Sequence, residues 1–161
     1  MKKHIMSLLA VVFLVGGCAN MQELSDCVIQ ERKAGKVGVT KVYPIPVGQA
    51  WAITEAVFRW EKTDEVAIHR TENYLITSTG MKMMTFGSVL GVWIEPVDLA
   101  NTKITAIAKR RVDSDFFTNL TEATFFERFE QGLKIVQDGK ELPVVSPEKN
   151  NQGENARRKE Q

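Results

Sequence analysis

Apolar and polar positions follow regular patterns along the middle of the chain, and these patterns predict strands and helices. The segment Val37–Tyr43 is rich in β-branched and aromatic residues, which favours a strand, and two prolines follow it. From Val47 to Lys62 the mostly apolar positions have the spacing of one helix face. Those positions are Val47, Ala50, Trp51, Thr54, Val57 and Phe58. We therefore expect a strand and then an amphipathic helix in which Trp51 and Phe58 anchor a core.

Four strands are predicted after this helix. Glu65–Arg70 and Tyr74–Thr79 are separated by a three-residue polar turn, which indicates a hairpin. The other two strands are expected over Ser88–Glu95, which ends at a proline, and over Thr102–Val112. In the strand Glu65–Arg70 the side chains should alternate between the two faces of a sheet, with Val66 and Ile68 on one face and His69 on the other.

A second amphipathic helix is predicted near the end of the pattern. Asn119 and Glu122 have the spacing of a capping box, and Gly139 is a suitable stop signal. The positions expected on its inner face are Leu120, Thr124, Phe125, Phe129, Leu133 and Val136.

This order of elements predicts one α+β domain over residues 37–142. The order is strand, helix, three or four strands, helix, summarised as β-α-β-β-β-α. Antiparallel strands with short connections favour a two-layer sandwich, with a sheet of about four strands and two helices on one face. The other face of the sheet should be more polar, and open to solvent or to a partner.

The N-terminus has a different pattern. Lys2, Lys3 and His4 precede an apolar stretch from Ile5 to Val15, which is too short to span a bilayer, since a membrane helix needs about 20 residues. A basic start and a short apolar segment are typical of a secretory signal peptide. We assign residues 1–17 to it.

The end of that signal peptide reads Leu14-Val15-Gly16-Gly17-Cys18. This resembles the lipobox of bacterial lipoproteins, although Val15 stands where Leu is commoner. The resemblance implies that Cys18 becomes the first residue of the mature chain and carries palmitate-type acyl chains, which anchor a protein stably when two or more are present. Because Ala19 rather than Asp follows Cys18, the family rule implies the periplasmic face of the outer membrane, with the inner membrane as the alternative.

Two further segments flank the predicted domain. Residues 18–36 are expected to form a lipidated tether, which is either a short helix over Met21–Ala34, with a thin apolar stripe at Leu24, Cys27 and Val28, or a flexible spacer. Residues 143–161 contain almost nothing that could be buried, so we expect a disordered tail.

Composition adds limits to this picture. The chain has 161 residues, 43% hydrophobic and 25% charged, with a formal charge of +1, which fits one globular domain. Removal of Lys2 and Lys3 with the signal peptide leaves 19 basic against 20 acidic residues. A charge near zero gives no support for a nucleic-acid partner. With Cys18 acylated, Cys27 is either an unpaired thiol without a role or a candidate for an intermolecular disulfide.

Candidate contact residues lie in three places. Met83, Met84 and Phe86 would form an exposed apolar patch if they lie in a loop; the alternative is that the strands extend through them and pack on the helices. Trp93 could face either side of the sheet. The basic run Lys109, Arg110 and Arg111 is explained either by charge pairing near Asp113 and Asp115 or as a docking point for an anionic partner, headgroup or glycan.

Catalytic and metal-binding patterns are missing from the sequence. His69 is the one histidine of the mature chain, and no zinc-binding, nucleophile-elbow or phosphate-binding motif is present. We therefore expect no cofactor, no metal and no enzymatic activity. An enzyme would need polar residues that converge on His69 or Asp113.

The middle of the chain also carries a family resemblance. From Tyr43 to Val136 the chain resembles a group of small envelope lipoproteins of Gram-negative bacteria that have no established activity. The motifs that carry this resemblance are Val47-Gly48-Gln49-Ala50-Trp51, Gly91-Val92-Trp93-Ile94-Glu95-Pro96, Lys109-Arg110-Arg111 and Leu120-Thr121-Glu122. The architecture is similar to the helix-grip modules of an accessory lipoprotein of the outer-membrane barrel-assembly machine. The resemblance implies no functional residue beyond Cys18.

The sequence leads to two hypotheses on function. The first is a non-enzymatic, membrane-anchored interaction or envelope-assembly module with an envelope protein as partner. The alternative is a carrier or sensor of a lipid or other apolar ligand, which would need a closed apolar cavity between the helices and the sheet.

Overall fold

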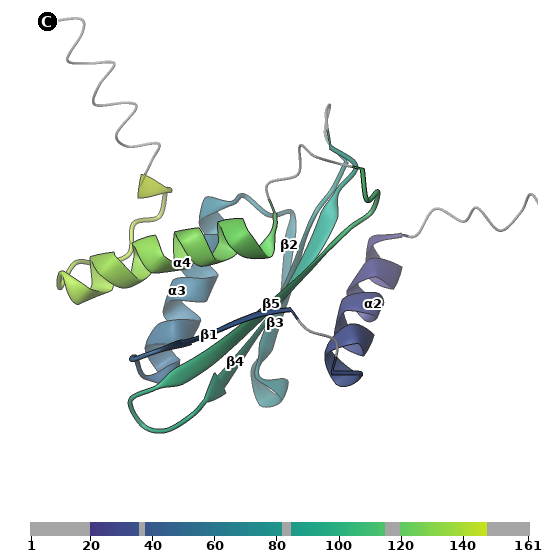
Figure 1. Ribbon diagram of the computed structural model, residues 1–161. Coiled ribbons are helices and arrows are strands. Elements are labelled where there is room, and N and C mark those ends of the chain that lie inside the picture. Colours follow the sequence, from purple (N-terminus) through teal and green to yellow (C-terminus); the bar gives the residue numbers. More distant parts are fainter. Residues whose placement is uncertain (1–19, 36–37, 82–84, 115–119, 148–161) are drawn as a thin grey trace, which may run out of the picture.

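A computed structural model describes residues 20–35, 38–81, 85–114 and 120–147 (Figure 1). The elements along the chain are helix α2 (Met21–Lys33), strand β1 (Val39–Tyr43), helix α3 (Val47–Trp60), strand β2 (Glu65–His69), the short 3₁₀ helix η2 (Arg70–Glu72), strands β3 (Tyr74–Thr79), β4 (Ser88–Pro96) and β5 (Thr102–Arg110), and helix α4 (Glu122–Gln137). The α+β class is confirmed. The signal peptide, Cys18, Met83, Met84, Asn119 and the last part of the expected tail lie outside the described residues.

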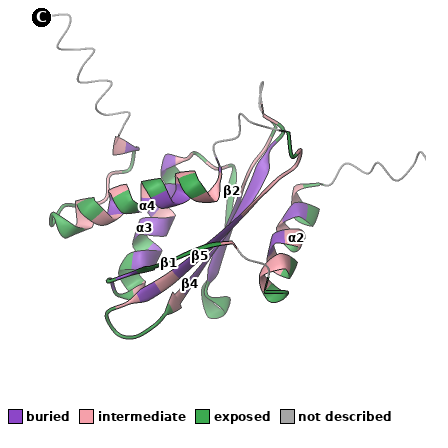
Figure 2. Ribbon diagram, in the orientation of Figure 1, coloured by how far each residue is buried: buried purple, intermediate pink, exposed green. Residues whose placement is uncertain are grey.

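All five strands form one antiparallel sheet in the order β1-β5-β4-β3-β2. The expected number of about four strands is therefore too low by one, because both strands of the β2–β3 hairpin and strand β1 join the same sheet. The two edge strands, β1 and β2, are largely exposed, whereas β3, β4 and β5 are mostly buried (Figure 2).

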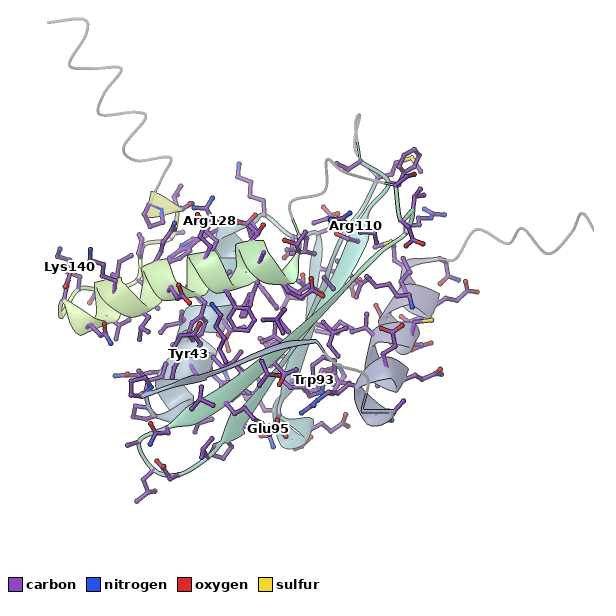
Figure 3. The ribbon with its side chains drawn as sticks, in the orientation of Figure 1. Tyr43, Trp93, Glu95, Arg110, Arg128 and Lys140 are labelled. Atoms are coloured by element: carbon purple, nitrogen blue, oxygen red, sulfur yellow. The ribbon has the colours of Figure 1, made fainter. Side chains whose placement is uncertain are left out.

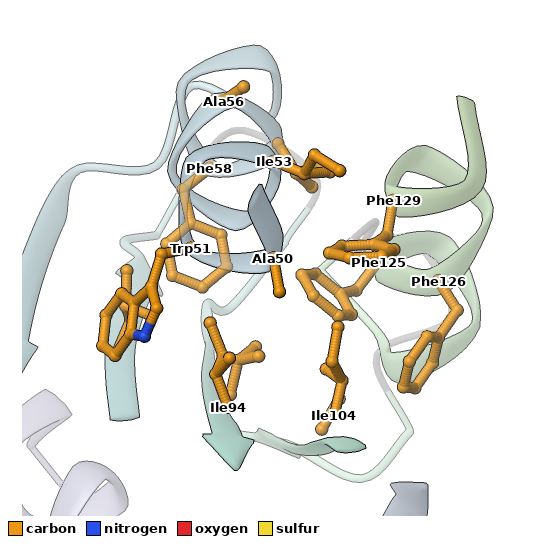
Figure 4. Close-up of a cluster of buried hydrophobic side chains, with 14 of the residues drawn as sticks. Ala50, Trp51, Ile53, Ala56, Phe58, Ile94, Ile104, Phe125, Phe126 and Phe129 are labelled. Atoms are coloured by element: carbon orange, nitrogen blue, oxygen red, sulfur yellow. The ribbon is translucent and has the colours of Figure 1, made fainter. Parts of the chain in front are cut away.

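Helices α3 and α4 cover one face of the sheet. Between them and the sheet lies the larger core, in which Phe58, Phe125 and Phe129 are at most 2% exposed (Figure 4). The ring centres of Phe129 and Tyr43 lie 4.9 Å apart, and those of Phe58 and Phe125 lie 6.1 Å apart, within the range of favourable aromatic pairs. The expected core role of Trp51 and Phe58 is confirmed, since both are buried.

Helix α2 covers the opposite face of the sheet, so the described part of the chain forms three layers with three α-helices (Figure 1). The expectation of two layers, with two helices and an open second face, is wrong. Leu24 and Val28 of α2 are buried against Ile76, Val89 and Trp93. The segment expected as a tether thus packs as part of the fold.

Local signals explain where α2 begins and ends. Asn20 and Glu23 form a complete capping box, in which the Asn20 side chain accepts from the Glu23 N–H and the Glu23 carboxylate accepts from the Asn20 N–H. Such a box satisfies two N–H groups that the first turn leaves without partners. After Ala34, Gly35 has a φ of +71°, which ends the helix in the conformation that glycine favours.

The N-cap of helix α4 lies two residues after Asn119, the expected cap. Thr121 is the N-cap, and its hydroxyl accepts a hydrogen bond from the Thr124 N–H. The Glu122 carboxylate instead accepts from the backbone N–H of Ala108 at 2.7 Å. Ala108 lies beyond the residues of β5 that pair with β1, so Glu122 satisfies a donor on the open edge of the sheet.

The first residues of the expected tail lie against the fold. Trp60 Nε1 donates to the carbonyl oxygen of Pro143 at 2.8 Å, and Ser146 is only 5% exposed. The indole hydrogen bond satisfies the polar atom of a buried tryptophan, which gives the chain after Leu142 a fixed place on α3.

Glu130 links edge strand β1 to α4. It accepts hydrogen bonds from Lys41 Nζ at 2.8 Å and from the Tyr43 hydroxyl at 3.0 Å. The bond from Lys41 is the main cause that holds the pKa of Glu130 below its ordinary value of 4.5. Burial, with Glu130 nearby, raises the pKa of the Tyr43 phenol.

This arrangement predicts a pH-dependent contribution to stability. Because the pKa of Glu130 is lowered in the fold, its contribution is present above pH 4.5 and is lost as the pH falls through the lower folded value. Both Lys41 and Glu130 are about half exposed, so we expect Glu130→Gln to cost only about 0.2–1 kcal/mol at neutral pH. Urea unfolding midpoints across the pH range test this. A difference from wild type that persists unchanged in strong acid would contradict it.

Candidate functional site

One row of side chains crosses the α2 face of the sheet from edge to edge. The strand register places His69, Tyr74 and Trp93 side by side on β2, β3 and β4. The His69 and Tyr74 rings stack with centres 4.4 Å apart and an interplanar angle of 13°, and the Tyr74 and Trp93 rings lie 5.6 Å apart. On β5 and β1 the row continues as Thr105 and Thr40, whose hydroxyls are 2.9 Å apart. Adjacent aromatic pairs of this kind stabilise strand pairing.

Trp93 therefore has a definite place that the sequence left open. It lies on the α2 face and is only 7% exposed. The guanidinium of Arg32, in the last turn of α2, lies 5.7 Å from the centre of its ring. Trp93 does not lie on the accessible surface, so it is a packing residue beneath α2 rather than a surface contact for a partner.

Ion pairs surround this packing. Arg32 binds Glu95 at 2.7 Å, and Glu95 also binds Lys103 at 3.1 Å (Figure 3). Glu31 binds Lys109 at 2.6 Å. All these side chains are 29–40% exposed, and such pairs contribute about 0–1 kcal/mol each. Burial of Leu24 and Val28, at about 1.5–3 kcal/mol per side chain, contributes more to the docking of α2.

A groove of about 410 Å³ lies beside α2, between that helix and strands β2 and β3. Helix α2 contributes Gln22, Ser25, Asp26 and Ile29 to it, and the strands contribute Glu65, Ala67, His69, Tyr74, Ile76, Thr77 and Ser78. Its floor includes the stacked His69 and Tyr74 rings. Two carboxylates and no lysine or arginine line it, so the groove favours a partner that presents hydrogen-bond donors or positive charge.

The groove brings His69, Asp26, Glu65 and Ser25 together, which the sequence did not predict. No hydrogen bond joins any two of these four side chains within the part of the chain that the structure describes, and Ser25 donates to the Met21 carbonyl instead. A catalytic base needs a partner that orients it. Among all the residues that the structure describes, no group of three or more His, Cys, Asp or Glu side chains is placed to hold a metal ion.

The apolar candidate patch is described only in part. Phe86 is 49% exposed, next to Gly87, at the end of the β3–β4 hairpin, and Met81, on the other side of the hairpin, is 66% exposed. Met83 and Met84 lie outside the described residues. The candidate residues predicted from the sequence did not include Met81, although it lies only two residues before Met83.

The three residues of the basic run have different environments. Lys109 faces α2, and its hydrogen bond to Glu31 raises the pKa of its ammonium group. Arg110 and Arg111 are half-buried at the end of β5 and have no ion pair with a described residue. The backbone N–H of Arg111 donates to the Gly87 carbonyl at 3.0 Å. The charge-pairing explanation therefore applies to Lys109, with a different partner from the one expected.

A scan against protein-family models and a search of curated proteins found no match for this chain. The family resemblance drawn from the sequence motifs thus stays an expectation. Within the described ranges no helix is both long enough and apolar enough to span a bilayer.

Proposed function

We propose that the protein is a lipid-anchored, non-enzymatic interaction module on the periplasmic face of the outer membrane, with an envelope protein as its partner. The position of α2 carries this proposal. The helix begins at Met21, three residues after the lipobox cysteine Cys18, and it is packed on the sheet. The proposed anchor and the α2 side of the groove therefore lie on one short, continuous segment, which would hold the groove near the membrane surface.

Two observations favour an interaction module over the other candidate classes. The groove is open and half polar, and strand β2 beside it has an unpaired edge, to which an extended segment of a partner can add by strand pairing. Among the described residues of the groove, no acid or hydroxyl is hydrogen-bonded to His69. Because a catalytic histidine needs such a partner to orient it, an enzyme is less well supported.

The carrier hypothesis has less support because the core is filled. Large side chains occupy the space between the sheet and helices α3 and α4. Among them, Phe58, Phe125, Phe129, Leu90, Ile94 and Ile104 are at most 2% exposed. Three grooves formed by described residues are open, and they lie at α2 or at the end of β5. A carrier would need an enclosed apolar cavity.

Acylation of Cys18 is the first testable part. Cys18→Ala should abolish palmitate labelling of the protein in growing cells and release it from the outer-membrane fraction, since one residue carries the anchor. Cys27→Ala is the matched control, because Cys27 lies in α2 and should not affect labelling. Unchanged labelling of Cys18→Ala would refute the anchor.

Site-specific crosslinking tests the partner surface. A photoreactive residue at Gln22 or Ala67, which line the groove, should give a crosslinked product with a single envelope protein in living cells. The control position is Glu127, an exposed residue of α4 on the other side of the sheet. Equal products from Glu127, or none from either groove position, would count against the groove as the binding surface.

A further inference from the structure

Helix α2 points its N-terminus toward the hairpin end of the sheet. Arg32, in its last turn, binds Glu95 near the far end of β4. Gln22, in its first turn, lines the groove together with Ser78, the residue before the last of β3. Figure 1 shows the same direction, with the start of α2 and the β3–β4 hairpin toward the same end of the molecule.

The proposed lipid must lie at this end as well. Two peptide units separate Cys18 from Asn20, the N-cap of α2, and two residues of extended chain reach at most about 7 Å. The acylated residue is therefore held within about 7 Å of Asn20, whatever path Ala19 takes. With so short a connection to the proposed lipid, the end of the domain at which α2 begins would lie against the bilayer.

The described residues of that end include two large apolar side chains that are partly exposed to solvent. Met81 and Phe86 flank the tip of the hairpin and are 66% and 49% exposed. Aromatic and other large apolar side chains next to a lipid anchor gain free energy by entering the boundary between headgroups and acyl chains.

Positive charge stands beside them. The backbone N–H of Arg111 donates to the carbonyl of Gly87 in the hairpin, and Arg110 lies opposite Ser88 in the register of β4 and β5. Neither guanidinium group has an ion pair with a described residue, although carboxylates are near: Glu31, Asp113 and Glu122 line a groove together with Arg110, and Asp64 and Glu65 lie on the β2 side of the hairpin. Basic residues near an anionic bilayer contribute about 1 kcal/mol each.

We propose that the hairpin end, defined as Met81, Phe86, Arg110 and Arg111, is a second contact with the phospholipid bilayer that fixes the orientation of the anchored domain. Met81 and Phe86 enter the headgroup boundary, and Arg110 and Arg111 bind lipid phosphates. This rests on the proposed anchor at Cys18. The β4–β5 turn then points away from the membrane, roughly 26 Å along β4 from the hairpin, and the groove beside α2 opens along the bilayer surface.

Fluorescence quenching by brominated lipids tests the orientation. The acylated mature protein is reconstituted in vesicles of phosphatidylethanolamine and phosphatidylglycerol that carry bromine on their acyl chains. Phe86→Trp should be strongly quenched. Leu99→Trp is the matched control, because Leu99 is 98% exposed in the β4–β5 turn and should show no quenching above wild type. The native tryptophans are buried, with 4–7% exposure, so the background is low. Equal quenching at both positions, or none at Phe86→Trp, overturns the proposal.

Charge variants in the Phe86→Trp protein test the role of the arginines. Arg110→Gln with Arg111→Gln should lower the ratio of docked to undocked orientations about 30-fold, from about 1 kcal/mol per residue. Lys134→Gln with Lys140→Gln removes the same charge from two exposed residues and should leave quenching unchanged. Lys134 lies in the last turn of α4, and Lys140, labelled in Figure 3, follows the end of that helix. Equal effects of the two pairs would overturn the role of the arginines.

Failure of the anchor is distinguishable from failure of this contact. If palmitate labelling shows that Cys18 is not acylated in cells, the mature chain with Cys27→Ser can be coupled through Cys18 to a maleimide-bearing lipid in the same vesicles. Quenching at Phe86→Trp under this coupling supports the contact independently of the biological anchor, and its absence overturns it.

Discussion

Phe129→Ala should lower the free energy of unfolding by about 3–5 kcal/mol, the usual cost of removing a buried aromatic side chain. Phe129 is fully buried, and its ring lies 4.9 Å from that of Tyr43 and 5.9 Å from that of Phe125. Because these neighbours come from a strand and from the same helix, they cannot close in without moving β1 or unwinding α4. Urea unfolding at neutral pH measures the loss.

Phe86→Ala is the control for that experiment, since it removes the same atoms from a half-exposed site and should cost less than about 1 kcal/mol. A loss below about 1.5 kcal/mol for Phe129→Ala, with an unchanged dependence on urea, would mean that the space around this ring is not tightly filled. That result would revive the hypothesis of a carrier with an internal cavity.

Gly91→Ala should lower the free energy of unfolding by about 1–3 kcal/mol, and its effect should concentrate on α2. An added Cβ at Gly91 would lie 2.7 Å from the Trp93 ring and 2.8 Å from a methyl group of Val28, closer than atoms pack. Overpacking of this kind forces side chains or backbone to shift. We expect the movable partner to be α2, because two buried side chains and a few ion pairs hold it.

Hydrogen exchange locates this effect. Amides of α2 should lose protection in Gly91→Ala, whereas those of α3 and α4 keep it. Gly48→Ala is the matched control: it lies in α3 with nothing within 4 Å of the added Cβ, and should be neutral or stabilise by up to about 1 kcal/mol. Equal loss of protection across all three helices would show that α2 does not dock as a separate unit.

The sequence predicted the α3–α4 side of the fold because its signals are local. The apolar positions from Val47 to Phe58 have a clear helical period, and the turn between β2 and β3 stands out as three polar residues. Each of these signals depends on neighbours within a few residues. The class and the antiparallel pairing followed from them.

The layer formed by α2 was missed, although β4 carried a signal for it. Val89, Leu90, Gly91, Val92, Trp93 and Ile94 are apolar without alternation, which indicates a strand that is buried on both faces. The expectation of an open second face came from the two-layer architecture and did not take this run into account. What covers that face could not be read locally, because the partners of α2 are distant in sequence: Arg32 binds Glu95 across 63 positions, and Glu31 binds Lys109 across 78.

The same separation in sequence explains why the groove beside α2 was not predicted. The groove forms only when the first helix lies beside strands that begin more than 30 residues after it ends, so no spacing of motifs could reveal it. The sequence showed the basic run Lys109, Arg110 and Arg111. It did not show that Lys109 is ion-paired and that the two arginines lie beside the hairpin, because this depends on the face of the sheet to which each side chain belongs.

If the protein is exported and acylated as we propose, the long sequence separation of α2 from its docking site also sets an order of events during export. A chain that leaves the cytoplasm N-terminus first presents α2 to the membrane before β4 and β5 have followed, so Leu24 and Val28 have nothing to pack on at that stage. Non-local contacts form late because the intervening chain must first be ordered. Under the proposed acylation, the modifying enzymes would act while α2 has no sheet to pack on, and completion of the sheet would then dock α2. Maturation of the lipid anchor and folding of the domain would be separated in time by the length of the chain itself.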